Sequence, residues 1–561
     1  MMKIETSSVI TLTNIDPGFR DAIKELNRHD NPDYVTAKQF GYDMEGIDRY
    51  IYDYRYDERL DKLVVPRGQG HRFQMNGVTV EETDLRVFSP VTLPASGIIL
   101  RKYQDFGFNQ IGDAKEGVVI APTGAGKTII GLTLIERKKQ KALILVHTKE
   151  LLKQWKKEVK AIFGFEPGIV NDEQSVTDRP ITIAMFQSAN ANIERLDPTS
   201  YGLVLVDECH HTPANTFSYV LDQIPAAYRY GLSATPKRRD NLQDILYNRL
   251  GPKIADIPFK MVQDAGGILP ARVTVVETGI VPTFKKEIKV KDPRTGRPTV
   301  KIIDAKVRKT NWHEYLTALA ENRHRNQFIA DVAINASATI PTLILVERVE
   351  HAEAIYELTG GVLLHGKLAD VTREEAMEAT AKAGITVGTP GLLGEGVDVS
   401  GWGHLILATP MSDEARILQA IGRVIRPGEG KDFGYLTDFI DNHSLSISSA
   451  SKRQKVYASR DYQVKRVKAD VGRTVLKPKR IDLKAIRDKE QADKLAKKAL
   501  RAAEKLAERA AIDRRKAHRA DAKVLRDNIK RRKALVREEK HAIKLEELAL
   551  KEKVASISMS I

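Results

Sequence analysis

Along most of this chain, short uninterrupted apolar runs alternate with amphipathic stretches, and this rhythm narrows the choice of folds more than any other feature. The first apolar runs occupy residues 117–122, 142–146, 181–186 and 201–206. A strand that helices cover on both faces reads as such a continuous run, whereas a half-exposed strand alternates apolar and polar residues. The rhythm returns at 341–346, 362–364, 385–387 and 404–408. We therefore predict an α/β fold with two lobes, each built on a parallel sheet.

Length and composition limit the number of folded units and the class of protein to which this chain can belong. A chain of 561 residues exceeds what one hydrophobic core supports, so we expect three or four folded units. No apolar run approaches the roughly 18 residues of a membrane span, and the N-terminus lacks a basic stretch followed by an apolar one. We expect a cytosolic protein without membrane contact. Cys209 is the single cysteine, which excludes an internal disulfide and leaves too few ligands for a cysteine-based zinc site.

Composition and pattern divide the chain into five segments. The first carries many tyrosines, and the third carries two basic β-like stretches around the turn Asp-Pro-Arg-Thr-Gly. The tyrosines could stack on nucleic-acid bases, but we prefer ordinary packing or surface positions. The hairpin could separate strands, but we prefer a plain linker. The expected segments are 1–90 (accessory domain, with DNA recognition as one role), 91–265 (first lobe), 266–320 (linker with a basic hairpin), 321–475 (second lobe) and 476–561 (basic helical tail).

The net charge of +16 is concentrated in the last part of the chain. Residues 451–561 hold 35 Lys and Arg and 16 Asp and Glu, whereas residues 1–450 hold 55 and 58. After residue 478 there is neither glycine nor proline, and Ala, Lys, Arg, Glu and Leu dominate, which favours a long charged helix. Such a helix could neutralise the phosphates of a nucleic acid, as we favour, or it could dock a partner protein.

The strongest chemical signal is a glycine-rich turn between the apolar run at 117–121 and a helical stretch. It reads Ala-Pro-Thr-Gly-Ala-Gly-Lys-Thr, with alanine in place of the usual first glycine. In this context the glycines let backbone N–H groups surround phosphate oxygens at a helix N-terminus. The lysine reaches the β and γ phosphates, and the final hydroxyl can bind Mg²⁺. We predict an ATP site formed by Ala121, Pro122, Thr123, Gly124, Ala125, Gly126, Lys127 and Thr128.

A second signal follows 80 residues later, where the apolar run at 203–206 ends in Asp207 and Glu208. Ligands of open α/β sheets bind at the carboxyl ends of the strands. Asp207 would hold Mg²⁺ together with Thr128, and Glu208 would orient and polarise the attacking water. A strand that ends in two carboxylates is often only a solvated edge, but the upstream phosphate loop favours the catalytic interpretation. We therefore predict Lys127, Asp207 and Glu208 as catalytic residues.

A third group of residues occupies the run Gln-Ala-Ile-Gly-Arg-Val-Ile-Arg at 419–426. Positions 419, 422, 423 and 426 fall on one face of a helix. Two arginines on that face can meet the γ-phosphate that the first lobe holds, and they can stabilise charge in the transition state. A helix with two arginines is usually only solvated, but within this ordered set we predict that Arg423 and Arg426 are catalytic.

In this order, the motifs resemble those of the DEAD/DEAH-box superfamily 2 helicases between residues 91 and 475. The resemblance implies two RecA-like lobes and nucleic-acid-stimulated hydrolysis of ATP with Mg²⁺. Contacts with the nucleotide, the adenine and the ribose included, would come from Gln104, Gly396 and Asp398. Coupling of hydrolysis to movement would involve Ser233, Thr235 and Gln419. Contacts with the nucleic-acid backbone would come from Thr148, Gln187, Ser188, His365, Gly366 and Thr389.

Within this superfamily, the Asp-Glu-Cys-His sequence at 207–210 and the short second lobe look most like the xeroderma-pigmentosum-B-like DNA helicases and the UvsW-like phage enzymes. The resemblance implies an ATP-dependent DNA helicase or translocase of repair, recombination or replication, in the cytosol of a bacterium or of a phage-infected cell. A translocating motor subunit of a restriction or nuclease assembly is one alternative. An RNA helicase is another, because backbone contacts do not identify the sugar. We disfavour a binding scaffold with a decayed ATPase, since every predicted catalytic residue is present.

Overall fold

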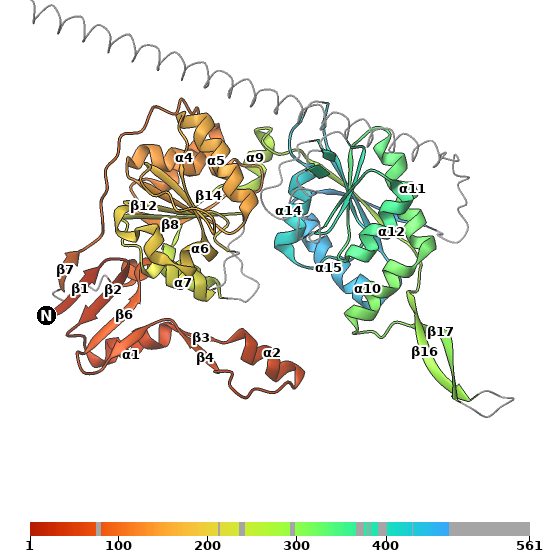
Figure 1. The fold of residues 1–561 in the computed structure, drawn as a ribbon, viewed down its shortest axis with the longest axis horizontal. Coiled ribbons are helices and arrows are strands. Elements are labelled where there is room, and N and C mark those ends of the chain that lie inside the picture. Colours follow the sequence, from red (N-terminus) through yellow and green to blue (C-terminus); the bar gives the residue numbers. More distant parts are fainter. Residues whose placement is uncertain are drawn as a thin grey trace, which may run out of the picture. The chain divides into compact units, whose positions relative to one another are not determined.

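The computed structural model describes most of the chain up to residue 469 (Figure 1). The described residues are 1–73, 80–210, 214–234, 242–291, 298–365, 375–376, 379–380, 383–390, 401–428 and 430–469. They all belong to one compact unit, Met1–Thr474. The predicted helical tail at 476–561 lies outside them. Among the helices within these ranges, none is long and apolar enough to cross a membrane.

The N-terminal segment is a small mixed domain. Its five-stranded sheet has the order β5-β6-β2-β1-β7, in which β1 and β7 are parallel and the other pairs are antiparallel. Apolar side chains of β1, β2 and β6 pack against Ile23 of α1, which begins at Pro17 after the capping carboxylate of Asp16. The elements are β1 (Met2–Thr6), β2 (Val9–Thr13), α1 (Pro17–Leu26), β3 (Arg28–Asp30), α2 (Pro32–Phe40), β4 (Tyr50–Tyr52), β5 (Arg55–Asp57), β6 (Lys62–Pro66), η1 (Arg67–Arg72) and β7 (Val80–Asp84).

The first lobe is built on a seven-stranded sheet in which all neighbours are parallel. Its order is β10-β11-β9-β12-β13-β8-β14. The strands are β8 (Glu116–Ile120), β9 (Ala142–Val146), β10 (Gly168–Val170), β11 (Ile181–Met185), β12 (Leu203–Val206), β13 (Tyr228–Ser233) and β14 (Lys253–Asp256). The helices are α3 (Lys102–Ile111), α4 (Lys127–Lys138), α5 (Lys149–Phe163), α6 (Phe186–Ala191), α7 (Ala214–Asp222), α8 (Gln243–Leu250) and α9 (Phe259–Asp264), with η2 (Ile193–Leu196) and η3 (Pro198–Ser200).

Burial of this sheet on both faces explains its uninterrupted apolar runs. Along a strand, successive side chains point to opposite faces. Val119, Ile144 and Leu205 accordingly belong to one core, which includes apolar residues of α4 and α5. Their neighbours Val118 and Val204 belong to a second core, which includes residues of α6, α7 and α8. Both faces therefore need apolar residues, and the predicted parallel sheet is confirmed.

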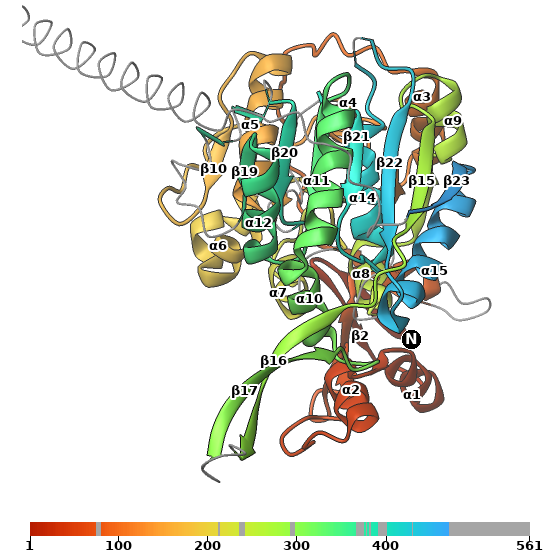
Figure 2. The same cartoon turned by 90° about the vertical axis from the view of Figure 1, so that its right-hand side faces the viewer.

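The second lobe repeats this plan. Its parallel sheet has the order β19-β20-β18-β21-β22-β15-β23. Figure 2 shows α11, α12 and α14 beside its strands. The strands are β15 (Ala271–Glu277), β18 (Thr342–Leu345), β19 (Val362–Leu364), β20 (Ile385–Gly388), β21 (His404–Leu407), β22 (Gly434–Ile440) and β23 (Gln463–Lys468). The helices are α10 (Trp312–Glu321), α11 (Arg323–Ser337), α12 (Val349–Thr359), α14 (Glu414–Val424) and α15 (Ser444–Ser459).

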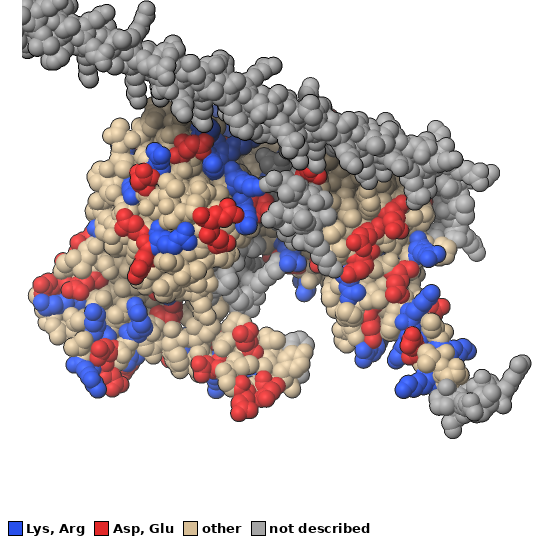
Figure 3. All heavy atoms as spheres, viewed as in Figure 1, with Lys and Arg blue, Asp and Glu red and all other residues tan. Residues whose placement is uncertain are grey.

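The segment that we expected as a linker contains more structure than a connection. Strand β15 pairs with β22 and β23, so the second sheet takes its first strand from residues 271–277. The basic stretches form β16 (Thr283–Lys291) and β17 (Pro298–Lys306), which pair in an antiparallel ribbon. Figure 2 shows this ribbon extending beyond the sheet, and Figure 3 shows Lys and Arg side chains gathered on it. The second lobe therefore begins earlier in the chain than the expected boundary at residue 321.

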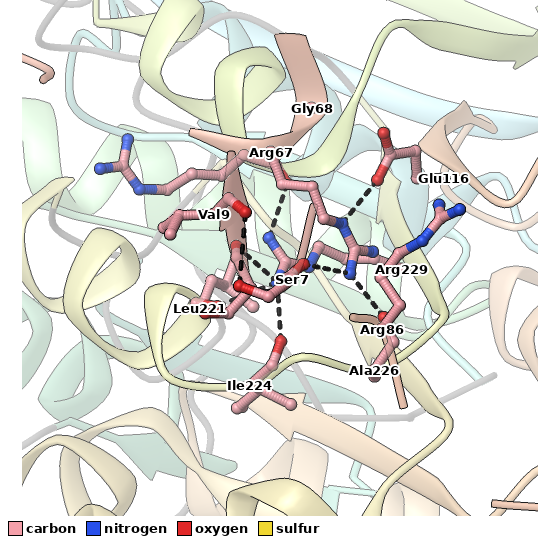
Figure 4. Close-up of polar contacts among 12 residues, drawn as sticks. Ser7, Val9, Arg67, Gly68, Arg86, Glu116, Leu221, Ile224, Ala226 and Arg229 are labelled. Atoms are coloured by element: carbon pink, nitrogen blue, oxygen red, sulfur yellow. Dashed lines mark hydrogen bonds and ion pairs between the residues drawn. The ribbon is translucent and has the colours of Figure 1, made fainter. Parts of the chain in front are cut away.

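Buried arginines join the N-terminal domain to the first lobe (Figure 4). Arg67 donates to the carboxylate of Glu116 at 2.8 Å and to the carbonyl of Ala226 at 2.5 Å. Arg229, which is fully buried in β13, donates to the carbonyl of Ser8 at 3.2 Å and to three carbonyls of its own lobe. Burial lowers the pKa of the Arg229 guanidinium well below its usual value. Since Glu116 opens β8, this junction lies on the strand that leads into the phosphate loop.

Candidate functional site

The glycine-rich turn has the backbone of a phosphate-binding loop. It connects β8, which ends at Ile120, to α4, which begins at Lys127. Gly124 and Gly126 have φ angles of 92° and 77°, a left-handed conformation that glycine adopts without steric cost. The residues from Ala121 to Thr128 thus stand at the N-terminus of a helix, where backbone N–H groups and the helix dipole favour an anion.

Three of the predicted catalytic side chains lie together at the carboxyl edge of the first sheet. Asp207 and Glu208 follow β12, and both are buried. The Nζ atom of Lys127 lies 2.5 Å from Oε1 of Glu208. The carboxylate of Asp207 accepts hydrogen bonds from the backbone N–H of Glu208 at 3.0 Å and from the indole N–H of Trp155 at 2.7 Å. The edge therefore combines one cation with two carboxylates directly beside the loop.

Burial raises the pKa of the Asp207 carboxyl. Together, burial of this carboxyl and the adjacent carboxylate of Glu208 raise its pKa to about 6. The ammonium of Lys127 and the indole N–H of Trp155 act in the opposite direction. A positive charge placed beside Asp207 would favour its ionised form.

The oxygen atoms at this edge fit a magnesium ion bound together with ATP. The hydroxyl of Thr128, in the first turn of α4, and the carboxylate of Asp207 are hard donors of the kind that Mg²⁺ prefers. Mg²⁺ is usually held by one or two protein groups, while phosphates and water complete its octahedron. Within the described part of the chain, no three His, Cys, Asp or Glu side chains converge as a self-sufficient metal site. The two oxygen donors thus suit a metal whose other ligands are phosphates and water.

Ser233, the first predicted coupling residue, ends β13 and touches the same edge. Its hydroxyl lies 2.8 Å from Nδ1 of His210, and this nitrogen lies 3.5 Å from Oε2 of Glu208. The backbone carbonyl of Ser233 accepts a hydrogen bond from the N–H of Ala121 at 2.9 Å. Ser233 therefore links the carboxylates to the phosphate loop. Thr235, the second coupling residue, lies outside the described residues.

The amide of Gln104 also reaches the loop. Gln104 is buried in α3, and its Nε2 donates to the carbonyl of Ala125 at 3.0 Å, while its Oε1 accepts from the N–H of Arg101. A Cβ atom on Gly126 would lie only 2.6 Å from this Nε2. Gln104 thus holds the loop in this structure, and the adenine contact that we expect of it stays a prediction.

The residues of the first lobe that we expect to contact nucleic acid follow neighbouring strands. Thr148 lies just after β9 and caps α5 by accepting from the N–H of Leu151 at 3.2 Å. Gln187 is exposed after β11 and donates to the carbonyl of His147 at 3.3 Å. Ser188 is buried, and its hydroxyl donates to Asp172 at 2.7 Å. Thr148 and Gln187 are therefore more accessible to a ligand than Ser188.

In the second lobe, two of these residues again follow adjacent strands. His365 lies after β19 and is buried, whereas Thr389 lies after β20 and is half-buried. The N–H of Thr389 donates to the carbonyl of Leu364 at 3.1 Å. Three further predicted residues, Gly366, Gly396 and Asp398, lie outside the described part of the chain.

The arginine segment differs from our expectation at its end. Gln419 and Arg423 lie in α14, but this helix ends at Val424, so Arg426 does not share a helical face with them. Pro427 explains the early end, because a proline disfavours helical backbone at the residue before it. A Cβ atom on Gly422 of α14 would lie 2.7 Å from Cγ2 of Thr123. The helix that carries Arg423 therefore touches the phosphate loop closely.

Trp155 is a site residue that we did not place at the ATP site from the sequence, because the stretch 146–155 resembles motifs that hold the nucleic-acid backbone. It belongs to the amphipathic stretch that forms α5, where a buried indole is expected to find an acceptor for its N–H. That expectation could have flagged it, but nothing in the sequence points to Asp207, 52 residues away, as the acceptor. His210 ends the Asp-Glu-Cys-His sequence at 207–210, and its contact with Ser233 depends equally on the fold.

Family models match both lobes. The model of the "Type III restriction enzyme, res subunit" matches residues 97–238, and the model of the "Helicase conserved C-terminal domain" matches residues 325–428. The first range contains the phosphate loop and the two carboxylates, and the second contains Arg423 of α14 and Arg426 beyond its end. Each match thus spans one group of predicted catalytic residues.

Curated relatives carry helicase and translocase names. "Probable helicase D10" of Escherichia phage T5 is 27% identical over 438 residues, which cover 77% of this chain and 91% of the phage protein. "DNA 3'-5' translocase XPB2" of Sulfurisphaera tokodaii is 33% identical over 163 residues, 29% of this chain and 37% of that protein. Among solved structures, T4 UvsW is 17% identical with a TM-score of 0.36, covering 84% of this chain and 99% of that one. The family matches and the named relatives thus make this chain similar, over both lobes, to helicases and to a DNA translocase of the XPB type.

Proposed function

We propose that this protein is an ATP-driven DNA helicase or translocase that remodels DNA in repair, recombination or replication. The observation that carries the proposal is the ion pair between Lys127 of the phosphate loop and Glu208 at the strand edge, beside Asp207. The name of the phage relative supports helicase activity, and the name of the other relative, a DNA translocase, supports DNA as the track.

The geometry suggests how nucleotide binding could prepare the site. Lys127 now pairs with Glu208, and the γ-phosphate of ATP would compete for the same ammonium group. Once Lys127 turns to the phosphate, the carboxylate of Glu208 can accept a hydrogen bond from the attacking water. Mg²⁺ held by Thr128 and Asp207 would neutralise part of the phosphate charge. Each group thus acts on charge that develops during transfer of the phosphoryl group to water.

Arg423 and Arg426 would complete the site from the second lobe. An arginine that meets the γ-phosphate only when the lobes close around ATP makes hydrolysis depend on closure. Alternate closing and opening, with Thr148 and Gln187 on one lobe and His365 and Thr389 on the other holding the DNA backbone, would move the protein along a strand. Arg426→Ala should then keep DNA binding and lose most of the hydrolysis rate. Equal loss of both would instead place Arg426 on the DNA track.

Substitution of the two paired residues tests the proposal. Lys127→Ala and Glu208→Gln should each lower DNA-stimulated ATP hydrolysis by about a hundredfold or more, because a positioned charge or orienting carboxylate contributes that much to the rate. Only Glu208→Gln should keep tight ATP binding. Hydrolysis by Glu208→Gln at the wild-type rate would overturn the assignment. The same assay with single strands, duplexes, forks, four-way junctions and RNA would identify the preferred track.

A motor subunit of a restriction or nuclease assembly is the second candidate, because the family model matched by the first lobe is named for a restriction subunit. Such a motor translocates along duplex DNA without separating its strands. Displacement of a third strand from a triplex reports translocation, and release of a labelled strand from a fork reports unwinding. Displacement of the third strand without unwinding would favour the restriction-type motor.

We further propose that the basic segment after residue 479 anchors the protein on DNA. The cytosol of a bacterium or of a phage-infected cell is the proposed location. The segment's excess of Lys and Arg supports the anchoring role, since each phosphate neutralised steepens the salt dependence of duplex binding by about 0.9 in log-log slope. Truncation after Lys479 should keep the maximal hydrolysis rate, raise the DNA concentration required and flatten the salt slope. An unchanged slope would favour the alternative, a docking site for a partner protein.

A further inference from the structure

The carboxylate of Asp207 is held in place by a side chain of α5, a helix outside the phosphate loop. Trp155 lies in the second turn of α5 and is fully buried. Its Nε1 donates to Oδ2 of Asp207 at 2.7 Å, while the N–H of Glu208 donates to Oδ1 at 3.0 Å. Because two donors approach the two oxygens separately, they fix the rotation of the carboxylate about its last bond. The 2.7 Å separation is typical of a hydrogen bond to an ionised acceptor.

Close packing fixes the indole itself. A Cβ atom added to Gly131 of α4 would lie 2.9 Å from Cη2 of Trp155 and 2.7 Å from Cδ2 of Leu205 in β12. The ring is thus wedged against the helix that follows the phosphate loop and the strand that leads to Asp207. Neither the ring nor its N–H can shift far, since protein interiors tolerate little overlap.

We propose that Trp155 is a positioning residue for ATP hydrolysis, whose indole N–H orients Asp207 to receive the Mg²⁺ of the bound nucleotide. This inference rests on the proposed function. The indole supplies a hydrogen-bond donor without a positive charge, so it orients the carboxylate and leaves its negative charge to the metal. Trp155 touches neither ATP nor water in this role and acts only through Asp207.

Trp155→Phe tests the proposal because it keeps an aromatic ring in the same space and removes the N–H. We expect half-maximal binding of a fluorescent, non-hydrolysable ATP analogue to need about tenfold more Mg²⁺, the effect of losing one hydrogen bond to a charged group. Hydrolysis should fall by a similar factor and recover at high Mg²⁺. A purely structural tryptophan would give no such recovery.

Trp402→Phe is the matched control, since Trp402 is also fully buried and donates its indole N–H to Thr386 at 3.2 Å in the second lobe. It should leave the Mg²⁺ dependence unchanged. The chain has three tryptophans, so the unaltered protein offers a second measurement: the indole N–H resonance that Trp155→Phe removes should shift when Mg²⁺ and the analogue bind. An unmoved resonance or an unchanged Mg²⁺ requirement in Trp155→Phe overturns the proposal. If Glu208→Gln still abolishes hydrolysis in parallel, the proposed function stands without it.

Discussion

Each lobe contains a buried aspartate with fixed partners, but the partners differ in charge. In the second lobe, Asp438 of β22 accepts bonds from Nε and Nη2 of Arg453 at 2.9 and 2.7 Å and from the hydroxyl of Tyr457 at 2.9 Å. In the first lobe, Asp207 accepts from an indole and a backbone N–H, which are both neutral. A guanidinium cancels the charge of its aspartate, whereas neutral donors orient a carboxylate and leave its charge to act on a ligand.

The comparison separates a structural carboxylate from a functional one by the charge of its donors. Burial is similar in the two cases, since both aspartates are almost inaccessible to solvent. Burial therefore does not tell them apart.

Removal of the cation should damage the second lobe most. Arg453→Met leaves the carboxylate of Asp438 buried without its guanidinium, which should lower the free energy of unfolding by about 3–5 kcal/mol. Denaturant unfolding followed by circular dichroism measures this loss. Arg466→Met is the control, because its partner Glu277 lies 3.6 Å away on the surface and such pairs contribute about 0–1 kcal/mol. Equal stability of the two variants would show that the guanidinium of Arg453 stabilises the second lobe no more than a surface ion pair does.

The same substitution should mainly slow hydrolysis at one aspartate and mainly lower stability at the other. Asp207→Asn keeps an oxygen for the indole N–H, but it loses the negative charge and turns its NH₂ group toward the N–H of Glu208. We therefore expect a small loss of stability and hydrolysis slower by about a hundredfold. Asp438→Asn should instead leave Arg453 without its counter-charge and lower the unfolding midpoint. Paired measurements of hydrolysis and thermal unfolding check both variants. A marked loss of stability in Asp207→Asn would show that its charge serves the fold.

A third buried aspartate should give the smallest effect because its cation has two partners. Asp53 of the N-terminal domain pairs with Arg249 at 2.6 Å, and Asp222 approaches the same guanidinium at 3.3 Å. Asp53→Asn leaves Arg249 one carboxylate, so the loss should be about 1.5 kcal/mol, the value of one hydrogen bond to a charged group. Asp21→Asn, at an exposed pair, should change nothing measurable. A loss in Asp53→Asn as large as that in Arg453→Met would contradict this reasoning.

Local sequence patterns predicted the two parallel sheets and the loop, because these features depend on neighbouring residues. The apolar runs specify strands buried on both faces, and the order Gly-Lys-Thr after such a run specifies a strand, turn and helix. Contacts between distant residues left no comparable signal. No sequence pattern near Trp155 indicates Asp207 as its partner, and none near Arg67 indicates Glu116.

Two local features were also missed. The ribbon β16–β17 separates β15 from the other strands of its sheet, so Ala271–Glu277 seemed to precede the second lobe. The helical spacing of Arg423 and Arg426 outweighed the effect of Pro427, which ends α14 before the second arginine. In both cases a strong neighbouring pattern hid a weaker signal.

The buried arginines that join the N-terminal domain to the first lobe decide where this protein can be shortened. A chain that began near residue 91 would lack the carbonyl of Ser8, Arg67 and Asp53. Arg229, Glu116 and Arg249 would then lose partners within a newly opened surface. Unpaired groups of this kind make a truncated protein aggregate or unfold. The first 73 residues thus belong to the folding unit of the ATPase, and the smallest working motor has to include them.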